Sequence, residues 1–311
     1  MDTALLIFHL REARRKARAT GSAEALGLLR DLQATAPESG PLSERGGIFW
    51  IALPRDTLDQ AVERLPRLGY TDTVDVLEPT AERKPSSRRK PSSDERVRWR
   101  GADYKLVRVY EEEAEVIREQ APDRRVFLFE ADDGEIRPVR GYRGDGKPLS
   151  RRALPVYDAR LLVNLVNSGR GGVCLDPFAG VGGIVLEALA SGYRVLSVDV
   201  DPMLRHGLTE MGAYHCVGEA QHLPLGAEAI DAIAAEPPYD PQAEAAVIDS
   251  LVEMNRVLKK EGRVAILCAA WQAPGLRQKA EALGLESYLD SPINRKGTDC
   301  VVMAWRKRRS S

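Results

Sequence analysis

The strongest constraint on the fold is the alternation of strand-like and helix-like runs from about Pro155 to the end of the chain. Apolar runs such as "GGVCLD", "YRVLSVDVD" and "RVAILCAAW" are typical of buried strands, and runs with helical spacing of their apolar residues lie between them. Strands that alternate with helices predict a parallel, doubly wound sheet. The stretch Arg295-Lys296-Gly297-Thr298 predicts an antiparallel hairpin that completes this sheet.

Upstream of this region the sequence divides into three shorter segments. Residues 1–80 run as strand, helix, strand, helix and strand, and they predict a small α/β unit, so that the chain has a smaller N-terminal α+β domain. Residues 81–100 carry a repeated Lys-Pro-Ser-Ser block and predict a basic, flexible linker. Residues 101–150 predict a strand, a helix over "EEEAEVIREQ" and a hairpin turning at Asp133-Gly134. This segment completes the N-terminal domain or forms a bridge to the C-terminal domain, which is expected at residues 151–311.

The charge distribution allows a polyanionic partner without requiring one. The net charge is −1 at pH 7, yet Lys and Arg gather at residues 83–100 and in the tail at residues 306–309. Taken alone, each basic run is more simply a solvated linker or tail.

Other features of the composition narrow the classes of function. The chain has four cysteines and four histidines without a paired-ligand spacing, so we expect reduced thiols and no metal site. No apolar run approaches the ~20 residues that cross a bilayer, and the N-terminal residues make a poor signal peptide. We therefore expect no membrane association and a cytoplasmic location, while the oligomeric state stays open.

Acidic residues follow four of the strands predicted in the C-terminal domain, namely Asp176, Asp199, Glu219 and Glu236. Ligands of doubly wound sheets bind beyond the carboxyl ends of the strands. The loop "PFAGVGG" follows Asp176, and its glycines allow the backbone to approach a ligand closely. Asp199 comes at about the 20-residue distance typical of an acid that holds ribose hydroxyls. Alternatively, Asp199 caps the helix that follows it.

The glycine loop favours one kind of cofactor over another. It does not match G-x-G-x-x-G, and Asp176 and Glu187 flank it, where a pyrophosphate would be repelled. An acid-lined nucleoside pocket suits a cationic cofactor that carries no phosphate. We therefore expect S-adenosylmethionine as the cofactor.

The stretch "AIAAEPPYD" ends a strand in a way that suits chemistry on an amine. Pro237 and Pro238 end the strand because they donate no hydrogen bond to a sheet, and they fix a carbonyl toward the cleft. Tyr239 offers a face on which a planar base can stack. Two acceptors that grip the hydrogens of an exocyclic amine, the Glu236 carboxylate and this carbonyl, would help the amine to attack a methyl group in line.

The motifs "DPFAGVGG", "VDVDP", "GEAQHLPL" and "EPPY", preceded by "ALPVYDARLLVNLV", occur in this order between Arg151 and Lys307. Together they resemble the Rossmann-fold, S-adenosylmethionine-dependent RNA methyltransferases that act on guanosine N2 in tRNA. The resemblance implies a Rossmann-like methyltransferase sheet and a tRNA partner. The N-terminal unit is similar to the ferredoxin-like part of the RNA-binding region that precedes such enzymes, and the linker and tail would add phosphate contacts.

The resemblance also implies roles for single residues. The loop after Asp176 would surround the methionine end of the cofactor, Asp199 would bind the ribose hydroxyls, and Glu219 and Ala220 would border the adenine. The residues expected to bind the cofactor are Asp176, Phe178, Gly180, Gly182, Asp199, Val200, Glu219 and Ala220. The residues expected to hold the target amine are Glu236, Pro237 and Tyr239.

Two positions depart from the family pattern. Glu236 stands where the family has Asp or Asn, and its extra methylene crowds the amine, shifts it, or leaves a site that binds without methylating. Glu219 stands where Asp is common, which matters less because it needs only to accept a hydrogen bond. Arg295 and Lys296 contact a phosphate or, more simply, lie in a solvated turn.

The sequence therefore predicts an S-adenosylmethionine-dependent methyltransferase that acts on an exocyclic base amine of RNA, with guanosine N2 of tRNA as the foremost substrate. Amino methylation of DNA adenine or of a protein glutamine amide is one alternative. A catalytically silent RNA module that binds the cofactor is another.

Overall fold

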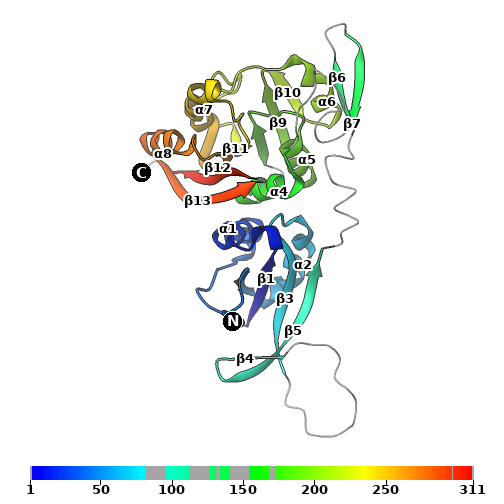
Figure 1. Cartoon of the computed structure of the whole chain (residues 1–311), viewed down its shortest axis with the longest axis vertical. Helices are drawn as coiled ribbons and strands as arrows, with labels where there is room; N and C mark the ends of the chain where they lie inside the picture. The colour runs from blue at the N-terminus through cyan, green and yellow to red at the C-terminus, as the bar shows by residue number, and fades with distance from the viewer. Residues whose placement is uncertain are drawn as a thin grey trace. The chain divides into compact units, whose positions relative to one another are not determined.

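The computed structural model describes residues 2–80, 96–112, 126–130, 134–140, 154–167, 172–295 and 297–309. The chain divides into two compact units, Met1–Glu113 and Ala114–Ser311, and each is described by itself (Figure 1). The helix predicted over residues 111–120 lies almost wholly outside the described residues. Among the helices in the described ranges, none is long and apolar enough to cross a bilayer.

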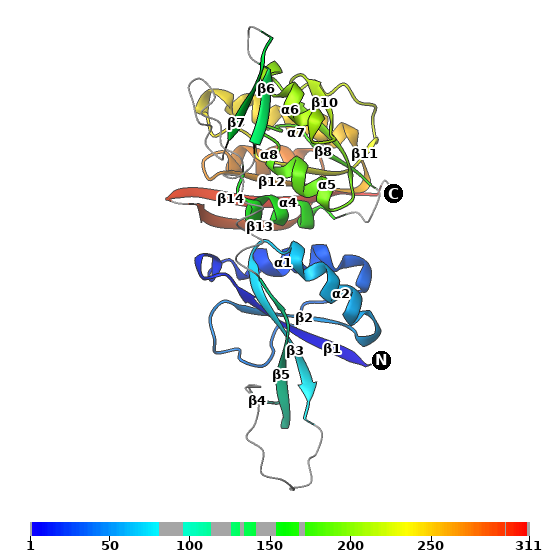
Figure 2. The same cartoon turned by 90° about the vertical axis from the view of Figure 1, so that its right-hand side faces the viewer.

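The first unit is an antiparallel sheet with two helices on one face (Figure 2). Its elements are β1 (Thr3–Leu10), α1 (Arg18–Leu28), β2 (Ile48–Pro54), α2 (Leu58–Arg64), β3 (Thr71–Pro79), β4 (Arg96–Trp99) and β5 (Ala102–Glu111). The strand order is β2-β1-β3-β5-β4. On one face Phe8 stacks on Phe49 with the ring centroids 4.8 Å apart. On the other face Ile7 packs with Trp50 and Leu77, so the apolar residues of β1 are buried on both sides.

Strand β4 occupies the end of the segment for which the sequence predicts a linker. It pairs antiparallel with β5, with Val97 opposite Tyr104. The side chain of Val97 is buried in the cluster that contains Ile7, whereas Arg96 and Arg98 on either side of it are exposed. This alternation places Val97, and Trp99 two residues further on, against the core face of the sheet. Residues 96–99 therefore differ from the prediction, because they pair with β5 and the side chains of Val97 and Trp99 pack against the core.

The second unit is built on a seven-stranded sheet. Its elements are β6 (Val126–Glu130), β7 (Ile136–Arg140), α4 (Val156–Leu165), β8 (Val173–Asp176), α5 (Gly183–Ala190), β9 (Arg194–Asp199), α6 (Arg205–Glu210), β10 (Tyr214–Val217), β11 (Ile230–Ala235), α7 (Glu244–Val257), β12 (Leu258–Ala269), α8 (Ala273–Ala282), β13 (Leu285–Arg295) and β14 (Thr298–Lys307). The strand order is β10-β9-β8-β11-β12-β14-β13, and β6 pairs with β7 as the hairpin predicted around Gly134.

The strands β10, β9, β8, β11 and β12 are parallel to one another, and β14 is antiparallel to both of its neighbours. The predicted fold class is confirmed: a doubly wound, Rossmann-like sheet ends in an antiparallel hairpin, and a smaller N-terminal sheet domain precedes it. The parallel strands β8, β9 and β11 lie side by side, so their carboxyl ends meet at one edge of the sheet.

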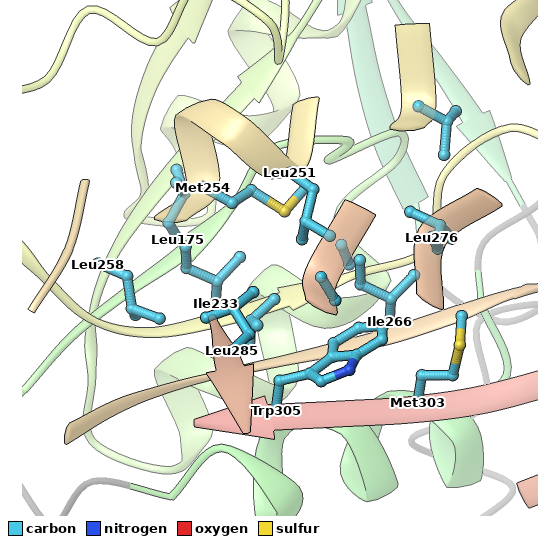
Figure 3. Packing of buried hydrophobic residues seen from close by; sticks show 14 of the residues in the cluster. Leu175, Ile233, Leu251, Met254, Leu258, Ile266, Leu276, Leu285, Met303 and Trp305 are labelled. Carbon is cyan, nitrogen blue, oxygen red and sulfur yellow. The ribbon is translucent and has the colours of Figure 1, made fainter. Parts of the chain in front are cut away.

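Helices cover both faces of this sheet. α4 and α5 lie together on one face, and α7 and α8 lie on the other (Figures 1 and 3). Leu251 and Met254 of α7 and Leu276 of α8 pack against Ile233 and Ile266 of the central strands (Figure 3). Full burial of one such side chain contributes about 1.5–3 kcal/mol. This core fixes the strands whose ends carry the predicted site.

Part of the basic tail predicted at residues 306–309 belongs to β14. Arg306 donates through Nη2 to Glu286 at 2.6 Å, and Lys307 donates to the carbonyls of Asn255 and Leu258, both at 2.8 Å. These two cations therefore hold the end of the sheet. The remaining cations of the run, at residues 308 and 309, lie beyond the strand and are exposed.

Candidate active site

Three of the predicted acids meet at one edge of the sheet. Asp176 ends β8, Asp199 ends β9 and Glu236 directly follows β11. β8 lies between β9 and β11, and all three strands are parallel, so the chain emerges at the same edge after each strand. The fourth acid, Glu219, follows the edge strand β10, which pairs with β9.

The glycine loop after β8 is attached directly to the end of β9. The Gly180 N–H donates to Asp199 Oδ2 at 2.8 Å. Gly180 and Gly182 have φ angles of 50° and 84°, which cost other residues about 1–2 kcal/mol. A Cβ on Gly180 would meet no described atom within 4 Å, whereas a Cβ on Gly182 would meet Met211 Sδ at 2.7 Å. Gly180 therefore borders open space, and Gly182 is packed against the protein.

Asp199 is held in one orientation by backbone donors. Its Oδ2 accepts from Gly180, and its Oδ1 accepts from the Asp201 N–H at 3.0 Å. The residue that caps the short helix η6 (Pro202–Leu204) is Asp201, which accepts from the Met203 N–H at 2.9 Å. The interpretation of Asp199 as a helix cap is therefore wrong. Each carboxylate oxygen has a further lone pair, so Asp199 can also accept from ligand hydroxyls.

Asp176 is almost fully buried beneath this loop. Burial, together with the charges of Asp199 and Glu236, raises the pKa of Asp176 to about 8, against a lowering by the N–H of Phe178. A positive charge placed near these carboxyl groups would favour their ionised forms. The acids at this edge thus fit a cationic ligand, and the open space at Gly180 leaves room for the backbone to approach it.

The other residues predicted to bind the cofactor are Val200, Phe178 and the two predicted to border the adenine, Glu219 and Ala220. Val200 is 67% exposed, an unusual position for an apolar side chain, and it directly follows Asp199. Ala220 is buried, and the exposed Glu219 contacts His222 Nδ1 at 3.2 Å. Phe178 is half-buried and packs against the apolar core, so a structural role also accounts for it.

Glu187, the second acid near the glycine loop, is neutralised within the protein. It lies in α5, and Arg160 of α4 donates to it at 3.3 Å, with both side chains buried. Glu187 therefore ties the two helices together. The acidic character of the edge comes from Asp176, Asp199 and Glu236.

The Glu236-Pro-Pro-Tyr segment forms a fixed turn at the end of β11. The Tyr239 hydroxyl donates to Glu236 Oε1 at 2.9 Å. The Pro238 carbonyl accepts from Gln272 Nε2 at 2.9 Å, and Gln272, which is fully buried, accepts from the Ala269 N–H at 3.0 Å. Burial, reinforced by the Glu236 charge, raises the pKa of Tyr239, so its hydroxyl stays protonated and can donate.

The prediction that Arg295 lies in a solvated turn is wrong. Only 15% of its side chain is exposed, and its Nε lies 3.0 Å from Asp158 Oδ2. Its Nη1 contacts Glu236 Oε1 and donates to the Tyr239 hydroxyl at 2.9 Å. Burial raises the pKa of Glu236, whereas Arg295 and the Tyr239 hydrogen bond lower it, and the net shift is upward. Lys296 lies outside the described residues.

A period-two signal in the sequence could have identified Arg295. Along β13 the side chains of Leu289, Ser291 and Ile293 are buried, whereas the residues between them are exposed. Arg295 follows in the same register, so it projects on the inner face. Asp158 carries a weaker signal. It is an acid in the first turn of α4, and the eight residues that follow it, up to Val166, are buried. Arg295 is not adjacent to any of the quoted motifs, whereas Asp158 lies within "ALPVYDARLLVNLV", one of the stretches that carry the family resemblance.

Comparison with known proteins gives a partial match. No family model matches the chain. The tRNA (guanine(10)-N2)-dimethyltransferase of Methanothermobacter thermautotrophicus is 37% identical over 95 residues, which are 28% of this chain and 28% of that protein. The enzyme of the same name from Methanocaldococcus jannaschii is 30% identical over 120 residues, covering 33% of this chain and 34% of that protein. The matched regions thus span about a third of these relatives.

Among solved structures, TrmN from Thermus thermophilus aligns over 98% of this chain and 99% of its own, with 17% identity and a TM-score of 0.49. The predicted resemblance to tRNA guanine-N2 methyltransferases is confirmed by the curated relatives, over the part of the chain that they match.

Proposed function

We propose that this protein is an S-adenosylmethionine-dependent methyltransferase that acts on an exocyclic base amine of RNA, foremost guanine N2 of tRNA. The observation that carries the proposal is the convergence of Asp176, Asp199 and Glu236 at the ends of three adjacent parallel strands. Sequence similarity to enzymes named for this reaction supports it.

Different residues of the proposed cofactor site contact different parts of the cofactor. Asp199 accepts the ribose hydroxyls, because its carboxylate is already oriented by Gly180 and Asp201. Gly180 lets the backbone approach the methionine end, and Asp176 balances its positive charge. The exposed Val200 offers an apolar surface for the adenine ring. When bound, S-adenosylmethionine supplies an electrophilic methyl group.

The target amine is held by the segment that follows β11. The Glu236 carboxylate and the Pro237 carbonyl accept the two hydrogens of the amine, which frees its lone pair for attack. The ring of Tyr239 stacks on the base, and its hydroxyl is fixed by Glu236 and Arg295, so the ring cannot rotate freely. No covalent bond forms between the protein and the base, and the Glu236 carboxylate can take up the proton that the amine releases.

The polymer partner is RNA. The described cations at residues 96, 98 and 100 on the β4–β5 hairpin are exposed, and residues 308 and 309 follow β14, so both units carry basic side chains that can contact phosphates. We place the protein in the cytoplasm, where tRNA is modified.

A second candidate function is a silent module that binds the cofactor without methyl transfer. The observation that favours it is the occupation of Glu236 Oε1 by Tyr239 and Arg295. Under this candidate, the parent protein binds S-adenosylmethionine and transfers no methyl group, and Glu236→Asp restores transfer because the shorter acid no longer reaches Arg295.

The proposal is tested by offering methyl-labelled S-adenosylmethionine together with unmodified tRNA, rRNA, DNA and protein pools. Label in tRNA alone is the expected result. Label in DNA or in protein would assign the alternative substrates, adenine or a glutamine amide. Cofactor binding with no label in any pool would favour the silent module, and absence of cofactor binding would reject the whole proposal.

A further inference from the structure

Arg295 joins two carboxylates that lie far apart in the sequence. Its Nε lies 3.0 Å from Asp158 Oδ2 on α4, and its Nη1 contacts Glu236 Oε1 after β11. The side chains of Asp158, Arg295 and Glu236 are only 1%, 15% and 22% exposed. Buried charges are retained when they are paired, so this arrangement fixes one guanidinium between two acids.

The guanidinium uses two different edges for its contacts. Nε faces Asp158, while Nη1 faces both Glu236 and the Tyr239 hydroxyl, to which it donates at 2.9 Å. Because the guanidinium is planar and rigid, the ion pair at Nε restricts the directions in which Nη1 can point. Arg295 thus connects Asp158 to Glu236.

Both of these contacts to Glu236 fall on the same oxygen. Tyr239 and Arg295 meet Oε1, and neither contact occupies Oε2. Building on the function proposed above, we infer that Arg295 is a positioning residue that holds Glu236 by Oε1, so that Oε2 accepts from the target amine, with Asp158 fixing Arg295 from behind.

The inference accounts for the length of the acid at this position. Asp in place of Glu236 would withdraw the carboxylate by one carbon–carbon bond, about 1.5 Å. The contact between this carboxylate and Arg295 would then be lost, and Arg295 would keep only its contact with Asp158 among these two acids. Glu236 and Arg295 therefore act together in this chain. The glutamate side chain is one methylene longer than aspartate, and the contact with Arg295 keeps its carboxylate in place.

The charges around Glu236 give the inference a measurable consequence. The groups that face it are Arg295 from β13, Asp158 from α4, Asp176 from β8, Cys300 from β14 and the Tyr239 hydroxyl. Arg295 is the one cation in this described set. Its removal therefore raises the pKa of Glu236 further, and a larger fraction of the carboxyl group is protonated at neutral pH.

The experiment compares the full-length parent with Arg295→Met, Arg295→Lys and Asp158→Asn. The matched control is Arg277→Met. Arg277 of α8 donates at 2.8 Å to Asp290, which lies on β13 like Arg295, but this pair is exposed. We expect Arg295→Met to lower kcat by ~100-fold and to leave the Kd of S-adenosylmethionine within about twofold. The acid limb of its kcat profile should move to higher pH.

The other variants should show smaller effects. Arg295→Lys should restore part of kcat, Asp158→Asn should lower kcat less than Arg295→Met, and the control should match the parent.

A second readout does not depend on turnover. The Glu236 carboxyl is followed by ¹³C NMR in protein labelled at the glutamate side chains, with Glu236→Gln giving the assignment. The pKa should be higher in Arg295→Met than in the parent and in the control. If the parent transfers no methyl group, the proposed function fails, and this titration alone decides whether Arg295 holds Glu236.

Two results would overturn the inference. One is an unchanged Glu236 titration in Arg295→Met, and the other is a kcat loss that appears only together with an equal loss of cofactor affinity. Should Arg295→Met fail to fold because Asp158 is left buried without this cation, the double variant Asp158→Asn/Arg295→Gln removes both charges and carries the same titration test.

Discussion

Gly180 donates its backbone N–H to the Asp199 carboxylate at 2.8 Å. Together with the hydrogen bond from the Ala179 N–H to the Val198 carbonyl at 3.0 Å, it connects the loop after β8 to the end of β9. The parts of the site that we propose for the methionine end and for the ribose are therefore joined. Under the proposed function, this relationship lets the glycine loop and the acid on the neighbouring strand hold one ligand.

Replacing Gly180 by alanine should weaken cofactor binding more than it weakens the fold. The φ of 50° costs alanine about 1–2 kcal/mol of unfolding free energy, and the new methyl group projects into the open space that we propose for the cofactor. Gly192→Ala is the matched control, because Gly192 has a φ of 83° and open space around it away from the site. Denaturant unfolding and calorimetric titration should show a similar loss of stability in both variants and a loss of affinity in Gly180→Ala alone. Equal affinities would remove Gly180 from the site.

Asp199→Asn should lower the affinity for S-adenosylmethionine by at least ~10-fold. A hydrogen bond to a charged group contributes about 1.5–3 kcal/mol. The asparagine side chain has one acceptor oxygen in place of two, so it cannot accept from both backbone N–H groups and from the ribose hydroxyls. Asp240→Asn provides the control, since Asp240 accepts from the Gln242 N–H at 2.9 Å in the cap of the short helix η7 (Pro241–Ala243). Calorimetry that finds both variants as tight as the parent would contradict the ribose role.

Asp176 should make the ligand-free protein less stable as the pH rises from about 4 to about 8. Its pKa is raised to about 8 in the folded state, against about 3.9 in an unfolded chain, so the folded state binds the extra proton between these values. Stability therefore falls with pH in this window, because the unfolded state binds fewer protons. Asp176→Asn should unfold at a higher temperature than the parent at pH 8, and the difference should shrink toward pH 4. Parallel curves for the two proteins would show that Asp176 is ionised in the fold.

RNA binding should weaken steeply with salt. Each phosphate that the protein neutralises contributes roughly 0.7–0.9 to the slope of log affinity against log salt. Exchanging the cations at residues 308 and 309 for glutamine should reduce the slope by about 1 to 2. The control exchanges Arg277 and Lys279, which are paired with Asp290 and Asp249. A filter-binding series without salt dependence would remove the phosphate role of these residues.

The sequence was sufficient to predict the parallel sheet, the terminal hairpin and the meeting of the strand-end acids, because each depends on local periodicity and on a general property of parallel sheets. The strand at residues 96–99 was not predictable in this way, since a four-residue run in which a valine and a tryptophan alternate with two arginines gives only a weak hydrophobic signal. Its assignment depends on the partner strand β5, which the local sequence does not reveal.

Arg295 shows the same difficulty at the site. Its neighbours Lys296 and Gly297 are typical of a solvated turn, and the property that decides its role is its distance from Asp158, a residue from another part of the chain. The alternation along β13 predicts only that Arg295 faces inward, because contacts between segments far apart in sequence leave no local pattern that identifies the partner. The predicted roles of the cofactor-binding residues stay predictions, and the structure adds Asp158, Gln272 and Arg295 to the residues that hold the target segment in place.

The central claim is methyl transfer to an exocyclic amine held by Glu236. Its most direct measurement is the modified nucleoside formed when the parent and Glu236→Gln are each incubated with S-adenosylmethionine and unmodified tRNA, followed by digestion and mass spectrometry. The account predicts N2-methylguanosine with the parent and at least ~100-fold less with Glu236→Gln, whose affinity for the cofactor stays unchanged. Equal yields from both proteins, or a methyl group on a ring nitrogen or a ribose oxygen, would contradict it.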